Sequence, residues 1–200
     1  GDTGGGVNAP RVEMTGCTVS GNEAVQTSGG IHAERAVLTG CTVIHNRGTL
    51  NGGGLWAGLE AWLTGCTIVD NEVNYEGGGV YAKEASLFGC IVAGNVGTRN
   101  VYVWDNDALY PDTGYEGTQH NVIGYVTGYT QADIFGAAPA LQDNGGPTRT
   151  IELKNGSAAA EKITEAQLRA REQELANVGF TVDLSLDQRG EPRPPGALAE

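Results

Sequence analysis

Thr39-Gly40-Cys41-Thr42-Val43 is one of four near-identical phrases that recur along this chain and decide its fold. The cysteines of these phrases are spaced by 24, 25 and 24 residues, at Cys17, Cys41, Cys66 and Cys90. An asparagine follows five positions after each cysteine, at Asn22, Asn46, Asn71 and Asn95. A repeat of this length cannot bury a core alone, so we expect the units to stack with like residues above one another.

Each unit contains three short stretches in which inward and outward residues alternate; in the second unit they begin at Ile31, Ala36 and Cys41. Alternation with a period of two, bounded by turn residues, predicts strands. Because the same strand returns in every unit, the chain is predicted to be all-β, a right-handed parallel β-helix of about five rungs. The expected inward columns are Val7/Ile31/Leu55/Val80, Ala9/Ala33/Ala57/Ala82, Met14/Leu38/Leu63/Leu87, Cys17/Cys41/Cys66/Cys90 and Val19/Val43/Ile68/Val92.

The repeat loosens after about residue 97, which predicts a β-helix over residues 1–157 with irregular last rungs. Residues 158–200 are expected to form a cap. Thr164 and Gln167 make a capping-box pattern within a helix predicted over residues 158–177. Phe180, Val182 and Leu184 then alternate as a closing strand. Because a β-helix has an unpaired edge at each end, we expect this helix and strand to cover the C-terminal edge.

Composition restricts the partners that the chain can have. The net charge of −12 argues against nucleic acid, whose phosphates need clustered lysine and arginine. The sequence contains no run of about 18 apolar residues, so it predicts no transmembrane segment. Both features suit a protein that faces water.

The second half of the chain carries a set of ordered motifs. They are Asn121-Val122-Ile123-Gly124, Leu141-Gln142-Asp143-Asn144-Gly145-Gly146-Pro147-Thr148, Asn155-Gly156-Ser157 and Asp187-Gln188-Arg189-Gly190-Glu191-Pro192-Arg193-Pro194. Their order resembles the signatures of the bacterial choice-of-anchor Q domain, and the glycine-rich repeats resemble those of polymorphic outer-membrane proteins. The resemblance implies a secreted or surface-attached bacterial protein with the pectin-lyase-like fold.

An outward column of rings is the first candidate binding site. It reads Asn8, His32, Trp56, Tyr81 and, on a fifth rung, Tyr102. Rings stacked along a groove can hold sugars by CH–π contact. The alternative is that stacked rings only stabilise the surface of the sheet through contacts between strands. The sequence leaves both interpretations open.

The cysteine and asparagine columns are predicted to be structural. Four aligned thiols can act as small buried apolar groups, or pair as Cys17–Cys41 and Cys66–Cys90. Four ligands in one straight column cannot surround zinc tetrahedrally, so a zinc site is not expected. The asparagines are expected to hydrogen-bond along the stack.

Two further clusters of polar residues stand out. Asp105, Asp107, Asp112 and Glu116 concentrate carboxylates in one loop, where a Ca²⁺ ion could find hard oxygen ligands. No other cofactor is indicated. His45 is expected to lie over Asp70, as a surface hydrogen bond or, alternatively, as a general-base pair.

These patterns favour a non-catalytic, extracellular or cell-surface module with adhesive, structural or self-assembly roles. An N-terminus that begins in a glycine run leaves a β edge open, so end-to-end pairing with another copy is one expectation, and surface glycans are the other partner. The alternative is a polysaccharide lyase or glycoside hydrolase. Its charged candidates, Glu34, Arg35, Lys83 and Glu84, lie on non-adjacent rungs.

Overall fold

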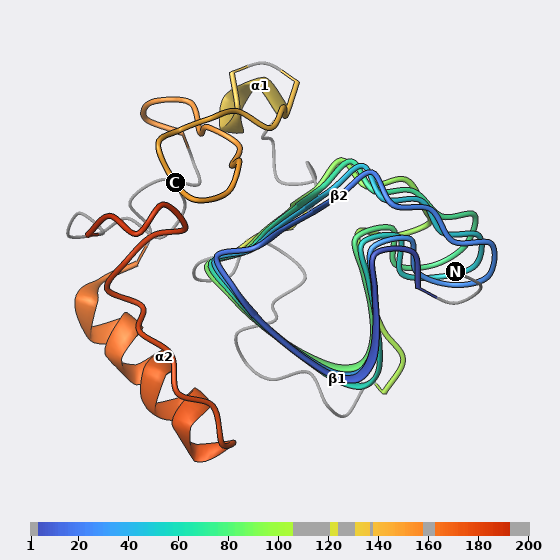
Figure 1. The fold of residues 1–200 in the computed structure, drawn as a ribbon, viewed down its shortest axis with the longest axis horizontal. Helices are drawn as coiled ribbons and strands as arrows, with labels where there is room; N and C mark the ends of the chain where they lie inside the picture. Colours follow the sequence, from blue (N-terminus) through green and yellow to red (C-terminus); the bar gives the residue numbers. More distant parts are fainter. Residues whose placement is uncertain (1–3, 106–120, 124–130, 137, 158–162, 193–200) are drawn as a thin grey trace.

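The repeats of this chain form a parallel β-solenoid of about four turns (Figure 1). The structure is a computed structural model that describes residues 4–105, 121–123, 131–136, 138–157 and 163–192. Viewed down the solenoid axis, successive turns lie almost on top of one another, and the two helices lie to one side.

In the part of the chain that the structure describes, ten strands form two parallel sheets. The first sheet has the order β1-β3-β5-β7-β9, and the second has the order β10-β8-β6-β4-β2. The strands of the first sheet are β1 (Val7–Thr15), β3 (Ile31–Thr39), β5 (Leu55–Thr64), β7 (Val80–Phe88) and β9 (Val101–Val103). Those of the second are β2 (Thr18–Ser20), β4 (Thr42–Ile44), β6 (Thr67–Val69), β8 (Ile91–Ala93) and β10 (Val122–Ile123).

The three strands expected in each turn appear as one long strand and one short strand. The first two expected strands merge into a single long strand that turns a corner along its length (Figure 1). The next corner lies at the glycine before each repeat cysteine, where Gly16, Gly40, Gly65 and Gly89 have φ of 61°, 55°, 60° and 61°. Glycine adopts this left-handed conformation without a steric penalty, which explains its place in every phrase.

The register of the strands confirms the predicted columns. Ile31 pairs with Val7 on one side and Leu55 on the other, and Leu38 lies between Met14 and Leu63. The aliphatic columns of the middle turns are completely buried, as are the alanine columns beside them. Because each column keeps one residue size, the turns can stack without voids or clashes.

Outside the repeats, the described residues of the tail form two helices. They are α1 (Gln131–Ile134) and α2 (Glu165–Asn177), and neither they nor any other helix in the described ranges could span a membrane. The capping box of α2 is confirmed: Gln167 N donates to Thr164 Oγ1, and Thr164 N donates to Gln167 Oε1. The first residues of the helix predicted over 158–177 lie outside the described residues.

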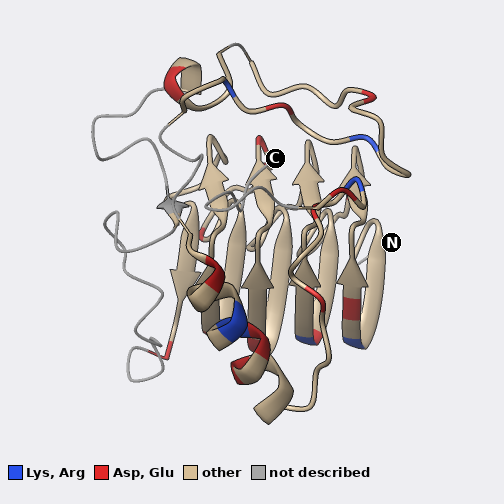
Figure 2. Ribbon diagram, turned by 90° about the vertical axis from the view of Figure 1, so that its left-hand side faces the viewer, with Lys and Arg blue, Asp and Glu red and all other residues tan. Residues whose placement is uncertain are grey.

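The expected closing strand is wrong. Residues 180–184 form no strand; instead Phe180 is buried with Leu175 of α2 against Val37 and Trp62 on the outer face of the first sheet. The apolar side chains of this segment are therefore buried on the sheet, while the backbone of residues 180–184 joins none of the described strands. The described contacts of α2 are with this lateral face (Figure 2), whereas the sequence had placed it on the C-terminal edge.

The tail also runs back along the solenoid to its first turn (Figure 2). Thr148 Oγ1 donates to the carbonyl of Gly16 at 3.0 Å, and Thr18 Oγ1 donates to the carbonyl of Arg149 at 2.7 Å. Gln188 Nε2 donates to Thr148 Oγ1 at 2.9 Å, which joins the two tail segments over the same corner. Thus the motif that ends at Thr148 and the motif that contains Gln188 meet at the first turn.

Candidate functional site

The predicted column of rings exists, and we call it the aromatic file: His32, Trp56, Tyr81, Tyr102 and Trp104. His32 and Trp56 stack with centroids 4.3 Å apart and planes 2° from parallel. Tyr81 and Tyr102 stack at 5.3 Å and 13°. All five side chains point outward from the first sheet and are partly exposed. The register places them there, because His32, Trp56, Tyr81 and Tyr102 occupy one position on four successive strands.

Trp104 is the member that sequence reasoning missed. Its ring lies 4.7 Å from Tyr81 and 6.3 Å from Trp56, tilted by 36° and 33°. The signal was present, since Trp104 follows Tyr102 by two residues and strand alternation places both on the same face. Trp104 therefore bridges the two stacked pairs into a continuous file.

The orientation of the rings decides what the aromatic file can bind. In each stacked pair one ring face is covered by the ring on the next strand, so the planes stand across the solenoid axis. The file thus offers ring edges, the Tyr81 and Tyr102 hydroxyls and the tilted indole of Trp104. An extended ligand along the axis could contact several rungs at once, whereas one sugar laid flat on a ring finds few free faces.

Gly58 makes room for the indole of Trp56. A Cβ atom at Gly58 would lie 2.8 Å from Cη2 and 3.0 Å from Cζ3 of Trp56, and 2.6 Å from Oε2 of Glu34. The six-membered ring therefore covers the glycine and lies beside the Glu34 carboxylate. Burial lowers the pKa of His32 below its usual value, and the nearby Glu34 carboxylate opposes this shift with a smaller effect.

Charged groups flank the C-terminal half of the aromatic file. Lys83 Nζ lies 3.6 Å from Glu84 Oε1 and 3.7 Å from Asp105 Oδ2. The Arg99 guanidinium lies over the Tyr102 ring, 5.3 Å from its centroid. Burial, and then the neighbouring Tyr102, raise the pKa of Tyr81, so its hydroxyl remains a hydrogen-bond donor at neutral pH.

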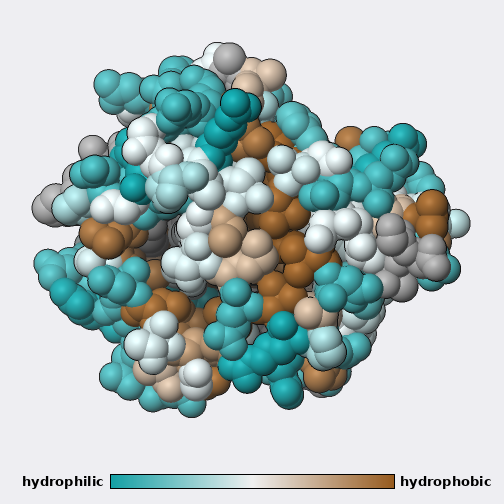
Figure 3. Space-filling model, viewed as in Figure 1, coloured by the Kyte–Doolittle hydropathy of each residue, from teal (hydrophilic) through white to brown (hydrophobic). Residues whose placement is uncertain are grey.

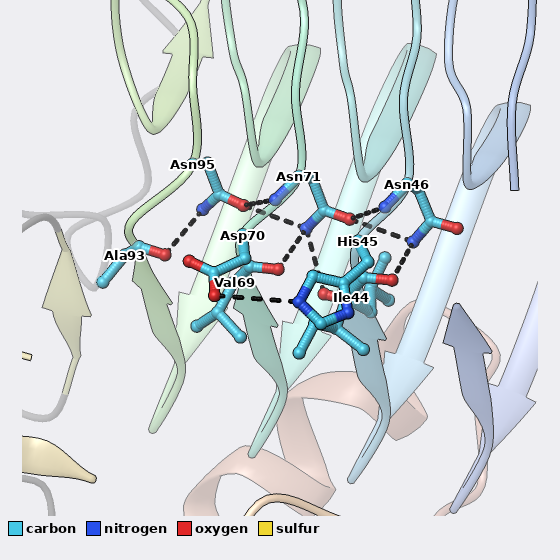
Figure 4. A network of polar contacts seen from close by, with 9 residues as sticks. Ile44, His45, Asn46, Val69, Asp70, Asn71, Ala93 and Asn95 are labelled. Carbon is cyan, nitrogen blue, oxygen red and sulfur yellow. Dashed lines mark hydrogen bonds and ion pairs between the residues drawn. The ribbon is translucent and has the colours of Figure 1, made fainter. Parts of the chain in front are cut away.

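The asparagine column forms a hydrogen-bonded ladder (Figure 4). The backbone N and Nδ2 of each member donate to Oδ1 of the next: Asn22 to Asn46, Asn46 to Asn71, Asn71 to Asn95, and Asn95 to Asn100. All distances lie between 2.9 and 3.1 Å. All donors point toward later rungs, so the ladder has a direction.

Each inner asparagine also satisfies backbone carbonyls at the end of the short strands. Asn71 Nδ2 donates to the carbonyls of Val43 and Val69, both at 3.0 Å. Asn71 itself has no exposed surface. The inner asparagines therefore hydrogen-bond along the stack, as predicted, and their amides have no capacity left for a ligand.

The cysteine column lines the core, and all four thiols are free. Cys66 Sγ donates to the carbonyls of Leu38 at 3.3 Å and Thr64 at 3.4 Å. Burial raises the pKa of the Cys66 thiol well above its usual value. Cys17, on the first turn, is the one member of the column that is partly exposed. Neither of the alternative disulfides, Cys17–Cys41 and Cys66–Cys90, is present.

His45 and Asp70 lie side by side as predicted, with Nε2 and Oδ2 3.9 Å apart (Figure 4). Their backbones are left-handed, with φ of 55° and 51°, and Gly21 and Gly94 have φ of 66° at the same turn. For a residue with a Cβ atom, this left-handed backbone conformation costs about 1–2 kcal/mol. The pair forms a contact at the surface, and on two other rungs the same position is occupied by a glycine, Gly21 or Gly94.

The predicted calcium site lies mostly outside the described residues, as Asp107, Asp112 and Glu116 do. Asp105 is described, and its carboxylate faces Lys83. Within the described ranges, no group of three or more histidine, cysteine, aspartate or glutamate side chains is arranged to hold a metal ion.

Comparisons with protein-family models, curated proteins and solved structures found no match for this chain. No family match therefore accompanies the resemblance of the tail motifs. What the structure establishes is the parallel β-solenoid, and any function must be argued from its own surface.

Proposed function

We propose that this chain is a non-catalytic, extracellular adhesion module, built as a right-handed solenoid, that binds glycans along the aromatic file. The observation that carries the proposal is the row of five partly exposed rings, four on neighbouring strands and the fifth, Trp104, directly after β9. Rungs lie about 4.8 Å apart, close to the length of one pyranose unit in an extended chain. A linear glycan along the axis could therefore repeat the same contact from rung to rung.

The chemistry of the aromatic file suits a sugar. Ring edges and the tilted Trp104 indole offer apolar contact to C–H groups, and the two tyrosine hydroxyls offer hydrogen bonds. The flanking Lys83, Asp105 and Arg99 add polar partners of both signs. A chain of charge −12 repels anionic polymers at long range, which favours neutral glycans.

Affinity electrophoresis through gels containing neutral β-linked polysaccharides tests the proposal. We expect retarded migration of the wild-type chain, and at least about tenfold weaker binding for the Trp104→Ala variant, since a dominant contact is worth about 1.4 kcal/mol or more. Tyr75→Ala is the matched control, because Tyr75 is 59% exposed but lies outside the aromatic file. Equal binding by both variants, or no retardation of the wild type, would refute the proposal.

A polysaccharide-cleaving enzyme is the second candidate. The observation that favours it is Lys83 between two carboxylates, Glu84 and Asp105, beside the rings. Incubation with uronate polymers and with neutral glycans, followed by ultraviolet absorbance and reducing-end assays, distinguishes the two. Release of products that Lys83→Met abolishes would replace the non-catalytic proposal.

A further inference from the structure

The sequence contains three Asn-Gly pairs, Asn51-Gly52, Asn144-Gly145 and Asn155-Gly156. Such a pair is chemically reactive, because the backbone nitrogen of the second residue can attack Cγ of the asparagine side chain. Glycine has no Cβ atom to hinder the approach of its nitrogen. Whether a pair reacts in the folded protein therefore depends on whether the structure lets these two atoms meet.

The reaction needs only the chain itself and water. The glycine nitrogen forms a bond to Cγ, the bond between Cγ and Nδ2 breaks, and Nδ2 leaves as ammonia with the proton of the glycine N–H. One water molecule then opens the resulting succinimide ring at either of its carbonyl groups. The product is aspartate, or isoaspartate when the main chain continues through the side-chain carbon, and both products add one negative charge.

The structure holds the first pair at both reacting groups. Asn51 Oδ1 accepts a hydrogen bond from Glu76 N at 3.1 Å, and Gly52 N donates to the carbonyl of Glu76, also at 3.1 Å. Gly52 is buried. The asparagine side chain and the glycine nitrogen are thus bound to the next turn of the solenoid, and both hydrogen bonds must break before the two atoms can meet.

The second pair is held within the tail. Asn144 Nδ2 donates to Thr150 Oγ1 at 2.9 Å and to the carbonyl of Thr150 at 3.4 Å. Gly145 N donates to Asp143 Oδ1 at 3.2 Å. The amide that has to leave and the nitrogen that has to attack are therefore both engaged, as they are in the first pair.

The third pair is free of these restraints. Asn155 and Gly156 are exposed, and among the described residues no hydrogen bond partner is found for the Asn155 side chain or the Gly156 nitrogen. The pair occupies the centre of a turn that Ser157 N closes by donating to the carbonyl of Lys154 at 2.9 Å. Gly156 has φ of 70°, as the second central residue of a type II turn requires.

The surroundings of this turn give water and motion access to it. Figure 3 shows mainly hydrophilic side chains over the part of the tail that lies beside α1 in the same view of Figure 1. A surface turn that one hydrogen bond closes opens readily, so the Asn155 backbone can rotate until the Gly156 nitrogen reaches Cγ.

We propose that Asn155 is a site of spontaneous covalent modification, at which the folded protein loses ammonia and forms aspartate or isoaspartate. The site is separate from the aromatic file and does not depend on glycan binding. The proposal rests on the contrast among the three pairs: the same two residues are held by hydrogen bonds twice and left unrestrained once.

The modification changes the attachment of the tail. Isoaspartate adds one carbon atom to the main chain between Lys154 and Ser157, which the hydrogen bond of the turn now joins. Lys154 N also donates to the carbonyl of Ile134 in α1 at 2.8 Å, and Ile151 packs with Ile134 on the second sheet. We therefore expect faster amide exchange in residues 151–157 of the isolated isoaspartate form, and unchanged exchange there would contradict this consequence.

Peptide mapping of the intact, folded chain tests the proposal. The chain is incubated in H₂¹⁸O at mildly alkaline pH, so that ring opening marks each event with heavy oxygen. Digestion after glutamate then places the three Asn-Gly pairs on separate peptides. We expect conversion at Asn155 to be at least about tenfold faster than at Asn51 or Asn144, where hydrogen bonds must break first. Equal rates, or a faster reaction at a held pair, would overturn the proposal.

The same incubation in urea separates the fold from the local sequence. Without the fold each asparagine is simply followed by glycine, so we expect the three rates to become similar. If Asn155 reacted much faster than the other two in urea as well, the local sequence would set the rate and the structural argument would be refuted.

A variant tests the protection directly. Thr150→Val removes the Oγ1 acceptor of Asn144 and keeps the shape of the side chain. We expect it to speed conversion at Asn144 severalfold and to leave the rate at Asn155 unchanged. An unchanged rate at Asn144 would show that its hydrogen bonds do not protect it, which would also count against the proposal.

Discussion

The solenoid of residues 4–103 and the tail of residues 131–192 are held by contacts of different kinds. In the solenoid the main contacts of the core and of the strand ends recur from turn to turn, as the asparagine ladder does at four successive steps. In the tail each contact is made once, as between the α2 residue Arg171 and the hydroxyls of Thr64 and Ser86. A contact that repeats on stacked turns is supported by the same contact on the turns beside it, whereas a single contact depends on one pair of residues.

The largest expected effect is the loss of one inner rung of the ladder. Asn71→Ala removes the donors to the Val43 and Val69 carbonyls and leaves them buried without this partner, so we expect the free energy of unfolding to fall by about 3 kcal/mol. Asn22→Ala, at the partly exposed end, should cost less than about 1 kcal/mol. Urea denaturation measures both. Equal losses would show that position along the ladder does not matter.

Arg171 provides the matching test in the tail. The side chain is 1% exposed, donates to Thr64 Oγ1 and Ser86 Oγ, and lies near the rings of Trp62 and Phe88 at 5.3 and 5.7 Å. We expect Arg171→Met to cost about 2 kcal/mol, mainly from lost charged hydrogen bonds. It should also speed amide exchange in α2 while leaving β3–β7 protected.

The control for Arg171 is Arg169→Met on the same helix. Arg169 forms exposed ion pairs with Glu165 and Glu172, which are worth less than about 1 kcal/mol. If Arg171→Met speeds exchange equally in the helix and in the sheets, the two regions unfold as one unit and the contrast between them fails.

A smaller effect is expected where the aromatic file meets the backbone. Gly58→Ala would place a methyl group against the Trp56 ring and the Glu34 carboxylate, so the ring must shift. We expect a change in tryptophan emission and a cost of about 1 kcal/mol, as for mild overpacking. Leu59→Ala, at an exposed neighbouring position, is the control. Unchanged emission in Gly58→Ala would place the ring elsewhere.

The smallest effect concerns Asp70. Burial raises its pKa above the usual 3.8, although the charge of His45 opposes this. A raised pKa means that ionisation of Asp70 lowers the free energy of unfolding. The stability is therefore greatest below pH 3.8, where the carboxyl is protonated, and decreases as pH rises through the pKa of the folded state. Asp70→Asn should therefore gain less than about 1 kcal/mol between pH 4 and pH 7 relative to the wild type. A gap in stability that does not change with pH would contradict this.

The sequence predicted the solenoid well because its period brings like residues together. The spacing of Cys41 and Cys66 alone implies that Leu38 pairs with Leu63, and the structure confirms it. The tail offers no period. Nothing local indicates that Thr148 would reach Gly16, more than 130 positions earlier, or that Phe180 would pack on Val37 instead of forming a strand.

In the candidate site, too, the repeat predicted some features and not others. The positions of His32, Trp56 and Tyr81 followed from the columns, and their neighbours on the next strands are as expected. Ring orientation did not follow, because it depends on how each ring packs against the next, as Trp56 does over Gly58. Strand alternation could have found Trp104, but only after Tyr102 was accepted as part of a fifth rung.

The tail contacts the first turn at one place and later turns at another, so its length must match the number of turns between these contacts. Thr148 and Gln188 bind the corner at Gly16–Thr18, while Arg171 is fixed two and three rungs further along, on β5 and β7. An internal duplication would separate these anchor points by about 4.8 Å, and the tail would have to lengthen with it. A coil added before the first turn changes neither distance, so this architecture can grow outward more easily than from within.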